Sequence, residues 1–455
     1  MTTIATPPAS DAAPSTMRTS QEPVSARASR GHIGWIVAGS FASGLLAAAL
    51  LVAVPFIPPT EAGLIGAVLC GLALGWAMLS VLSARFTDQP QRWAGAPALV
   101  MGLSGLLLVS FGSSALELLS WVWPPVMLAL AIWMLVCARR HLHSPSRLWL
   151  VFPVLAVLAL ASLGGGYQTV RVAVDASANA MPGQLFDVGG HSLHLNCTGS
   201  GSPTVVLEPG AGMVSAQLGL ITPTVARETR VCVYDRAGRG WSEPAETRQD
   251  ATQIATDLHT LLERAHVPGP YVLAGHSFGG LYVLTFAARY PDEVAGMVLV
   301  DSTAPASTTD ATTTATATAT ATDDEASSDL TDRVVTLVSA SARLGLTRLI
   351  GLPTPNAVRS TIEEYGQGGS STREAGWLRD FAGKPLVVLT ADIGHDADES
   401  AAQDALATLS TASVHRVIQG VDHLGMIADE DGAAATTRAV LDVVGSIQTA
   451  VPLID

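Results

Sequence analysis

Charged residues are scarce in this chain. Asp, Glu, Lys and Arg make up only 14% of the 455 residues, aromatic residues make up 5% and there are 4 cysteines, whereas 48% of the residues are hydrophobic. Soluble globular chains usually contain roughly 25% charged residues. The composition therefore excludes a single soluble domain as a description of the whole chain, and the length alone predicts more than one domain.

The few charges are divided unevenly along the chain. Residues 1–170 contain 8 Arg and 5 acidic residues, a net charge of +3. Residues 171–455 contain the other 17 basic and 34 acidic residues, a net charge of −17. Because the acidic part has no basic cluster that could neutralise phosphates, we expect no nucleic-acid partner. The division predicts one part adapted to lipid and one adapted to water.

Long hydrophobic runs fill the first part of the chain. Residues 1–30 form a polar tail rich in Ala, Ser, Thr and Pro, which we expect to be disordered. Five uncharged apolar runs follow within residues 31–170, and about 20 such residues suffice to cross the hydrocarbon core as a helix. We therefore predict a transmembrane domain of about five helices. The runs are Ile33–Ile57, Ala62–Leu82, Ala96–Leu116, Trp121–Ala138 and Leu148–Gly166.

The placement of arginine predicts how these helices are oriented. Arginines lie before the first run, between the second and third, and between the fourth and fifth, whereas the other two loops contain no Lys or Arg. Positively charged loops favour the cytoplasmic side. With five passages, residues 171–455 lie outside, so we predict a multi-pass cell-membrane protein with an extracytoplasmic C-terminal domain. An even number of passages would reverse this orientation.

Residues 171–455 show a different pattern, in which short apolar runs alternate with helical stretches. The runs are uninterrupted, as in buried parallel strands, and the stretches Ala251–Ala265 and Gly280–Tyr290 have helical spacing. This alternation predicts an α/β domain with a mostly parallel sheet, preceded by a hairpin of Gln184–Asp187 and Ser192–Cys197. The predicted parallel strands are Thr204–Glu208, Arg230–Tyr234, Tyr271–Ala274, Gly296–Val300 and Leu386–Thr390.

One short segment has the pattern of a catalytic nucleophile. Gly275–Gly279 reads Gly-His-Ser-Phe-Gly, and it follows a predicted strand and precedes a predicted helix, which is the context that the G-x-S-x-G signature requires. The two glycines permit a turn too tight for side chains and leave the Ser277 hydroxyl exposed. A serine hydroxyl is a weak nucleophile until a histidine takes its proton. Ser277 is therefore the predicted nucleophile, and we expect a packing role for His276.

These motifs resemble the α/β-hydrolase superfamily over roughly residues 182–450. Three further segments fit its pattern: Thr204–Gly212 (TVVLEPGAG) is similar to its oxyanion loop, Tyr234–Glu243 (YDRAGRGWSE) to its YDRxGxGxS turn, and Gly420–Gly425 (GVDHLG) to the loop of its catalytic histidine. The resemblance implies a serine esterase- or lipase-like α/β-hydrolase fold with an inserted cap. It argues against the epoxide hydrolases and haloalkane dehalogenases of this fold, which use an Asp nucleophile.

The resemblance also implies a general base and a triad acid. His423 follows the apolar run Val414–Ile418 and comes after the serine in chain order, so it would be the general base. The acid would hold the histidine tautomer and stabilise the imidazolium. We favour Asp301, directly after the strand that follows the serine, and Asp392 is the alternative after the next strand.

The oxyanion hole implied by the resemblance consists of backbone N–H groups. They would be those of Phe278, next after the nucleophile, and of Ala211. The family often has His-Gly in this loop, whereas this chain has Pro209-Gly210. The backbone donor is unaffected by this departure, but the role of Glu208 stays open.

The cysteines fit the same sheet. Cys197 ends the second strand and Cys232 lies in the fourth, and these strands are neighbours in the hydrolase sheet order. The resemblance therefore implies a disulfide between them, a bond that persists only outside the cytosol. Two buried free thiols are the alternative. Cys70 and Cys137 lie inside predicted spans.

The family places its cap where this chain has residues 302–381. Within it, residues 303–328 form a low-complexity Thr/Ala segment with too little large apolar surface to offset its ordering entropy, so we expect disorder there. Leu330–Leu352 then has amphipathic helical spacing. We interpret it as a cap helix packed over the site, with a lid that touches lipid as the alternative.

Together these observations predict a membrane-anchored serine hydrolase that cleaves carboxylic esters through an acyl-enzyme. Its partners would be membrane lipid and a small-molecule or lipid-like ester, and no cofactor is needed. No histidine spacing suggests a metal site. Another acyl-group hydrolase or transferase of this fold, such as a peptidase or thioesterase, is one alternative, and a catalytically silent membrane sensor or scaffold is another. The oligomeric state and the acyl and alcohol groups of the substrate stay open.

Overall fold

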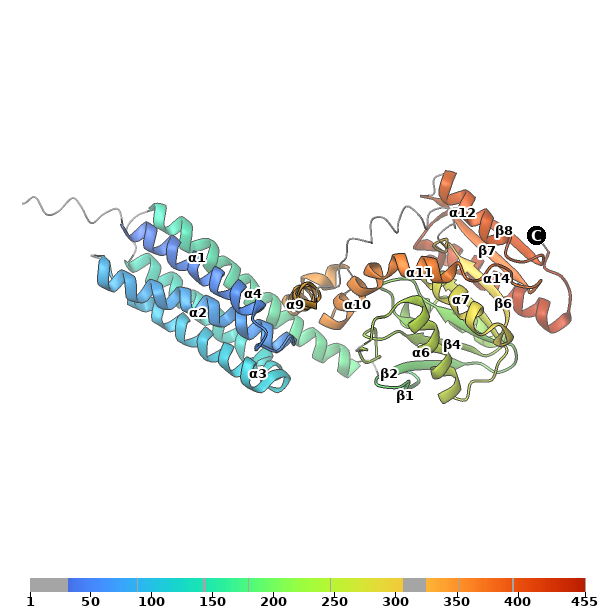
Figure 1. The fold of residues 1–455 in the computed structure, drawn as a ribbon, viewed down its shortest axis with the longest axis horizontal. Coiled ribbons are helices and arrows are strands. Elements are labelled where there is room, and N and C mark those ends of the chain that lie inside the picture. The colour runs from blue at the N-terminus through green and yellow to red at the C-terminus, as the bar shows by residue number, and fades with distance from the viewer. Residues whose placement is uncertain are drawn as a thin grey trace, which may run out of the picture.

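The chain folds as a helical bundle followed by an α/β domain, with cap helices between them (Figure 1). This computed structural model describes residues 32–87, 89–141, 145–178, 180–245, 247–305, 325–350, 352–394 and 397–454. The two segments expected to be disordered, the polar tail and the low-complexity segment, lie outside the described residues except at the ends of the latter.

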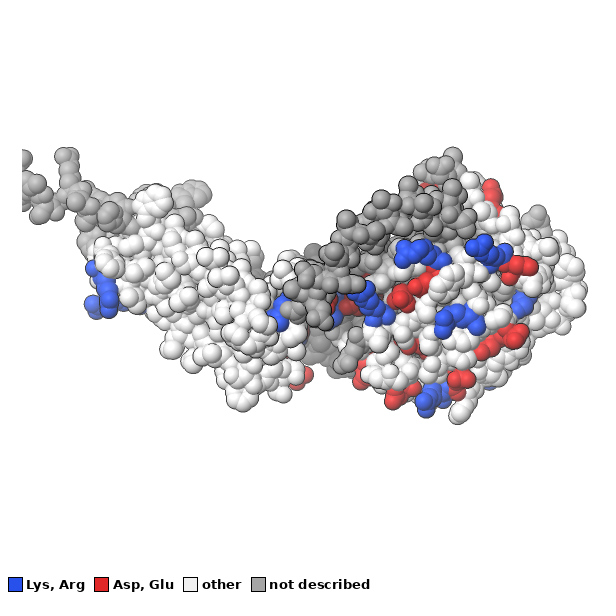
Figure 2. All heavy atoms as spheres, in the orientation of Figure 1, with Lys and Arg blue, Asp and Glu red and all other residues white. Residues whose placement is uncertain are grey.

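The bundle contains the apolar runs of the first part of the chain. Among the described residues, four helices are long and apolar enough to cross a membrane. This is one helix fewer than the number of apolar runs, because α3 includes both the third and the fourth run. The visible surface of the bundle is almost free of charged side chains, in contrast to the α/β domain (Figure 2). The helices are α1 (His32–Ala53), α2 (Glu61–Phe86), α3 (Gly95–His141) and α4 (Pro145–Ala178).

Helix α3 reverses direction within its length. Gly112 has non-helical angles, φ 60° and ψ −135°. Trp123 Nε1 donates a hydrogen bond of 2.9 Å to Ser104 Oγ. In a straight helix these two residues would be separated by about 28 Å, since the rise is about 1.5 Å per residue. The two halves of α3 therefore lie side by side, and Thr169 of α4 donates to the Ser120 carbonyl beside the second half.

The α/β domain is built on an eight-stranded sheet of order β1-β2-β4-β3-β5-β6-β7-β8. Strands β3 to β8 are parallel to one another. The pairs β1–β2 and β2–β4 are antiparallel. The predicted hairpin and parallel strands are all present, with ends that differ by a few residues. The strands are β1 (Gln184–Asp187), β2 (Ser192–Thr198), β3 (Thr204–Glu208), β4 (Val231–Asp235), β5 (Tyr271–His276), β6 (Val294–Val300), β7 (Leu386–Ile393) and β8 (Ser413–Asp422).

Helices cover both faces of this sheet, as its uninterrupted apolar strands require. One core cluster joins the sheet to α6 and α7, and a second joins its other face to α5 and α14. The helices and 3₁₀ turns of the domain outside the cap are η2 (Ser215–Leu218), α5 (Thr222–Glu228), α6 (Ala251–Arg264), α7 (Phe278–Arg289), η3 (Pro291–Glu293), α12 (Ala397–Ala407), α13 (Gly425–Ala428) and α14 (Glu430–Thr449).

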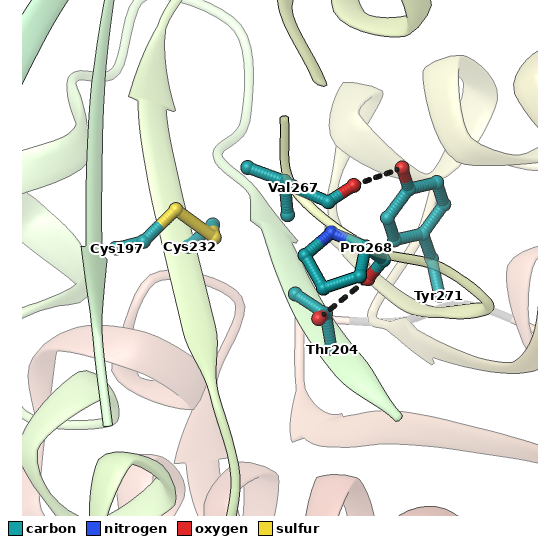
Figure 3. The surroundings of a disulfide bond; sticks show 6 residues. All are labelled: Cys197, Thr204, Cys232, Val267, Pro268 and Tyr271. Atoms are coloured by element: carbon teal, nitrogen blue, oxygen red, sulfur yellow. Dashed lines mark hydrogen bonds between the residues drawn. A yellow bond between two sulfur atoms is a disulfide. The ribbon is translucent and has the colours of Figure 1, made fainter. Parts of the chain in front are cut away.

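A disulfide joins two strands of the sheet. Cys197 of β2 and Cys232 of β4 are directly paired in the antiparallel register and form a disulfide (Figure 3). The predicted pairing is thus confirmed. Cys70 and Cys137 are free thiols on α2 and α3.

The cap contacts both parts of the molecule, but it is not the single helix expected. The helical stretch that begins in α9 ends at Ala340, and Gly345 with φ 78° follows between two 3₁₀ turns. Leu337 of α9 packs on the bundle, so this helix does not cover the serine as predicted. The cap elements are α9 (Glu325–Ala340), η4 (Ser341–Leu344), η5 (Leu346–Ile350), α10 (Pro355–Gly366) and α11 (Gly368–Ala375).

Polar contacts fix the cap on the end of the bundle. Arg343 forms an ion pair with Glu61 at the start of α2. Arg348 pairs with Asp175 of α4 at 2.7 Å. On the other side, the Tyr365 ring of α10 lies 5.4 Å from the Phe278 ring beside the predicted nucleophile. The cap therefore bridges the bundle and the α/β domain.

Candidate active site

Ser277 lies on a sharp turn between β5 and α7. Its backbone has φ 55° and ψ −125°, a conformation that a non-glycine residue adopts only when its surroundings enforce it. A Cβ atom on Gly275 would lie 2.5 Å from the Gly279 carbonyl oxygen, and one on Gly279 would lie 2.5 Å from the Glu208 carbonyl oxygen. Both glycines are therefore required by close backbone contacts, as their pattern predicts.

His423 and Asp301 meet at the carboxyl edge of the sheet. His423 lies in the loop between β8 and α13, and its Nδ1 is 2.6 Å from Asp301 Oδ2. A carboxylate accepts only, so Nδ1 carries the proton and Nε2 is left as a base. Asp301 directly follows β6, with φ 46°, and its Oδ1 accepts from the Ala391 N–H at 3.0 Å.

Contacts of the Ser277 backbone and of the neighbouring His276 ring place Ser277 at the same edge of the sheet. Its N–H donates to the carbonyl of Val300, the residue before Asp301, at 3.1 Å. The ring of His276, the residue before the serine, lies 4.7 Å from the His423 ring. The three predicted triad members thus lie at the same edge of the sheet, after β5, after β6 and in the loop after β8.

The alternative acid, Asp392, has a different partner. Its Oδ1 accepts from the Val421 N–H at 3.2 Å, on the strand before the histidine loop. Of the two candidate acids, Asp301 is the one whose carboxylate contacts His423.

His276 is buried, as expected, but it does more than fill space. Its Nε2 lies 2.9 Å from the His423 carbonyl oxygen, and because a carbonyl only accepts, Nε2 must be protonated. Burial lowers the pKa of His276 to about 4. A neutral His276 therefore anchors the backbone of the histidine loop.

The predicted oxyanion donors flank the serine. Phe278 is the first residue of α7, so its N–H is one of the donors that a helix leaves without an internal partner. Ala211 lies between two glycines of the loop after β3. A Cβ on Gly210 would approach the Ser277 Cβ to 3.1 Å, so this loop is packed directly against the nucleophile.

Comparison with known proteins agrees with this topology. Residues 203–395 match the family model described as the alpha/beta hydrolase fold. The C-terminal domain has the α/β-hydrolase fold.

Individual relatives are distant. A protein of Schizosaccharomyces pombe without assigned function is 34% identical over 165 residues, 30% of this chain and 31% of that protein. The 2-(acetamidomethylene)succinate hydrolase of Mesorhizobium japonicum is 30% identical over 132 residues, 29% of this chain and 47% of that enzyme. The enol-lactonase structure from Burkholderia xenovorans LB400 has 20% identity and a TM-score of 0.42, covering 58% of this chain and 100% of that one. This chain thus spans less than half the length of both curated relatives.

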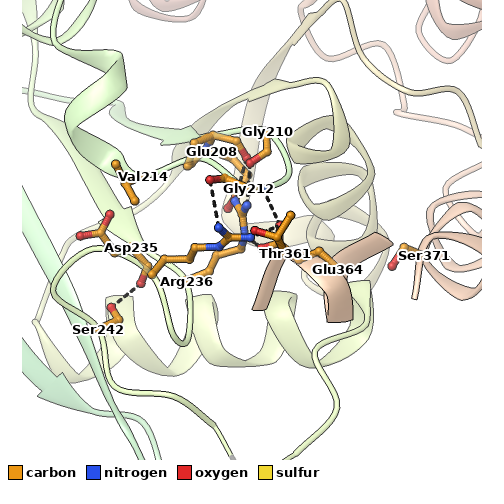
Figure 4. A network of polar contacts seen from close by, with 12 residues as sticks. Glu208, Gly210, Gly212, Val214, Asp235, Arg236, Ser242, Thr361, Glu364 and Ser371 are labelled. Atoms are coloured by element: carbon orange, nitrogen blue, oxygen red, sulfur yellow. Dashed lines mark hydrogen bonds and ion pairs between the residues drawn. The ribbon is translucent and has the colours of Figure 1, made fainter. Parts of the chain in front are cut away.

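The α/β-hydrolase domain also holds a buried charge cluster that the sequence did not reveal. Arg236 lies between Glu208 and Glu364 (Figure 4), and Arg239 pairs with Glu364 as well. All four side chains are at most 3% exposed. Burial raises the pKa of Glu208 to about 7, although Arg236 Nη1 is 2.5 Å from its carboxylate and Tyr234 donates to it. Because Arg236 also donates to the Pro209 carbonyl, Glu208 supports the loop that was predicted to contain an oxyanion donor.

The sequence indicated only part of this buried charge cluster. Glu208 is the last residue of the buried strand Thr204–Glu208, and Arg236 lies in the YDRAGRGWSE turn. A charged side chain can be buried there only if an opposite charge pairs with it. Nothing in the sequence indicated the partner on the cap. Among the described residues, no group of three or more His, Cys, Asp and Glu side chains is placed to hold a metal ion.

Proposed function

We propose that this protein is a membrane-anchored serine hydrolase that cleaves carboxylic esters. The observation that carries the proposal is the contact of 2.6 Å between His423 and Asp301 beside a serine held at φ 55°. A strained serine next to a carboxylate-oriented histidine is the arrangement that acyl transfer needs. The name of the Mesorhizobium japonicum relative supports hydrolysis over transfer.

In the proposed reaction, Ser277 Oγ attacks the ester carbonyl carbon while His423 Nε2 takes the hydroxyl proton. The buried Asp301 carboxylate stabilises the imidazolium through Nδ1–H. Negative charge on the carbonyl oxygen is bound by the N–H groups of Phe278 and Ala211. The alcohol leaves with the proton from His423, and water then attacks the acyl-enzyme with the same histidine as base.

We further propose that the bundle spans the cell membrane and that the hydrolase domain lies outside. Because α3 runs out and back, the chain makes five passages, and the start of α1 and the hydrolase domain lie at opposite ends of the bundle (Figure 1). Arg85, Arg92, Arg139 and Arg140 belong to the end away from the hydrolase domain, which supports a cytoplasmic position of that end. The disulfide supports the same orientation.

The test is labelling with a fluorophosphonate, which reacts with activated serines. Membranes that contain the full chain should be labelled, and Ser277→Ala should abolish both labelling and hydrolysis of short-chain and long-chain esters. Ser302→Ala is a matched control, because Ser302 is a buried serine nearby whose hydroxyl donates to the Gly275 carbonyl at 2.9 Å.

Other outcomes select the alternatives. Labelling without ester turnover, but with cleavage of thioesters or peptides, would select another acyl-group hydrolase of this fold. No labelling at Ser277 in folded protein would contradict catalysis and favour a silent sensor or scaffold.

A further inference from the structure

A carboxylate from the cap is bound directly to the oxyanion loop. Glu364 lies on α10 and is 3% exposed. Its Oε2 accepts from the Gly212 N–H at 2.7 Å and from Arg239 Nη2 at 3.0 Å, and its Oε1 accepts from Arg236 Nε at 2.9 Å (Figure 4). Burial alone would raise the pKa of Glu364, but the facing charges of Arg236 and Arg239 outweigh burial and hold the pKa below its ordinary value. Glu364 is therefore ionised.

The arginine held by this carboxylate binds the same loop. Arg236 donates from Nη1 to the Pro209 carbonyl and from Nη2 to the Gly210 carbonyl, both at 2.7 Å. In a trans peptide the carbonyl and the following N–H point in opposite directions. The N–H of Ala211 therefore points away from Arg236.

The peptide between Ala211 and Gly212 is held by Glu364 itself. The Gly212 N–H, which belongs to the Ala211–Gly212 peptide, donates to Glu364 Oε2 at 2.7 Å. The carbonyl of the peptide after it, that of Gly212, accepts from Arg239 Nη1 at 2.9 Å. Both peptides that contain Ala211 are thus oriented by groups that converge on one cap carboxylate. A flip of either peptide would break a charge-assisted hydrogen bond in a buried site, where such bonds are strong.

We propose that Glu364 is a positioning residue, through which the cap orients the Ala211 N–H toward the oxyanion of the transition state. This inference rests on the proposed function. Its consequence is that the cap completes the catalytic site and does more than cover it. Loss of one oxyanion donor typically costs ~10²–10³ in rate, and a mispointed donor should cost about 10- to 100-fold.

The experiment compares Glu364→Gln with Glu363→Gln in the full chain. Glu363 is the neighbouring residue of α10 and makes only a partly exposed ion pair with Arg359. The kcat for an ester is measured per fluorophosphonate-labelled site, together with KM and the affinity for a trifluoromethyl ketone, which forms a tetrahedral oxyanion on the serine. For Glu364→Gln we expect kcat and ketone affinity to fall about 10- to 100-fold with KM changed less than threefold, and for Glu363→Gln no change.

A purely structural role would give a different result. It would lower the melting temperature and the number of labelled sites, while kcat per site and ketone affinity stay at wild-type values, and that result would overturn the assignment. If Glu364→Gln fails to fold, Glu364→Asp keeps the charge with a shorter reach, and wild-type kinetics in this variant would equally overturn it. No ester turnover by the wild-type chain would instead overturn the proposed function, and this inference with it.

Discussion

His423 Nδ1 lies 2.6 Å from Asp301 Oδ2, although 122 residues separate the two in the chain. The Asp301 side chain is fully buried, whereas that of His423 is 51% exposed. One edge of the imidazole is thus fixed by a buried charge and the rest remains accessible. The contact makes Asp301 the acid to test first.

Asp301→Asn should lose most of the turnover, while Asp392→Asn should not. An amide at position 301 can donate to His423 and so stabilise the wrong tautomer, which in triad enzymes costs up to about 10⁴ in rate. Asp392 accepts from the Val421 backbone rather than from His423, so we expect a change of less than about threefold. The test is the kcat/KM of both variants for an ester. An equal loss of kcat/KM in both would contradict the assignment of Asp301 as the triad acid.

His276 should make the protein less stable in mild acid. Its folded pKa of about 4 lies below its ordinary value of 6.5. Between these values the unfolded chain binds a proton that the folded chain does not, so stability falls as the pH drops through this window. At pH 5 the effect is about 2 kcal/mol. The melting temperature should fall less between pH 7 and pH 5 for His276→Asn than for wild type; equal decreases would exclude this role.

Gly275→Ala should prevent formation of the nucleophile turn. The added Cβ would meet the Gly279 carbonyl oxygen at 2.5 Å, a backbone atom that cannot give way. Gly445→Ala on α14 is the control, because its Cβ meets nothing within 4 Å, and it should raise helix stability slightly. Fluorophosphonate labelling and the folded yield in detergent measure both. Normal labelling of Gly275→Ala would show that the turn tolerates a side chain.

The proposed orientation predicts which positions an impermeant maleimide reaches in intact cells. In a background with Cys70→Ser and Cys137→Ser, we expect Glu263→Cys to be labelled, since the Glu263 side chain is 69% exposed on the hydrolase domain. Arg85→Cys, at the end of α2 away from that domain, should react only after permeabilisation. The reverse pattern would mean that the hydrolase domain faces the cytoplasm.

Much of the α/β domain follows from local sequence. The uninterrupted apolar runs became β3 to β7, because strands buried on both faces need no polar alternation. The Gly-His-Ser-Phe-Gly turn could be located because its glycines are demanded by contacts within a few residues of chain. The Cys197–Cys232 pair followed from the sheet order that the motifs implied.

Features that depend on distant contacts were not accessible in the same way. The choice between Asp301 and Asp392 depends on where the histidine loop packs, which no local pattern determines. No sequence pattern indicated that Glu364 is buried, and its burial depends on arginines 125 to 128 residues earlier in the chain. The third and fourth apolar runs were predicted to be separate passages, but the sequence did not place the reversal between them at Gly112, which lies inside the third run.

The cap contacts on the bundle limit how the hydrolase domain can move relative to the bundle. A domain joined to a membrane anchor by one linker can rotate freely, but here the chain after α4 and the ion pairs of Arg343 and Arg348 hold the hydrolase domain at separate places. Two points of attachment prevent the rotation of the hydrolase domain that a single linker would allow. In the proposed orientation, Ser277 would therefore keep a constant height above the bilayer, and the lateral position of the bundle would determine which molecules the serine meets.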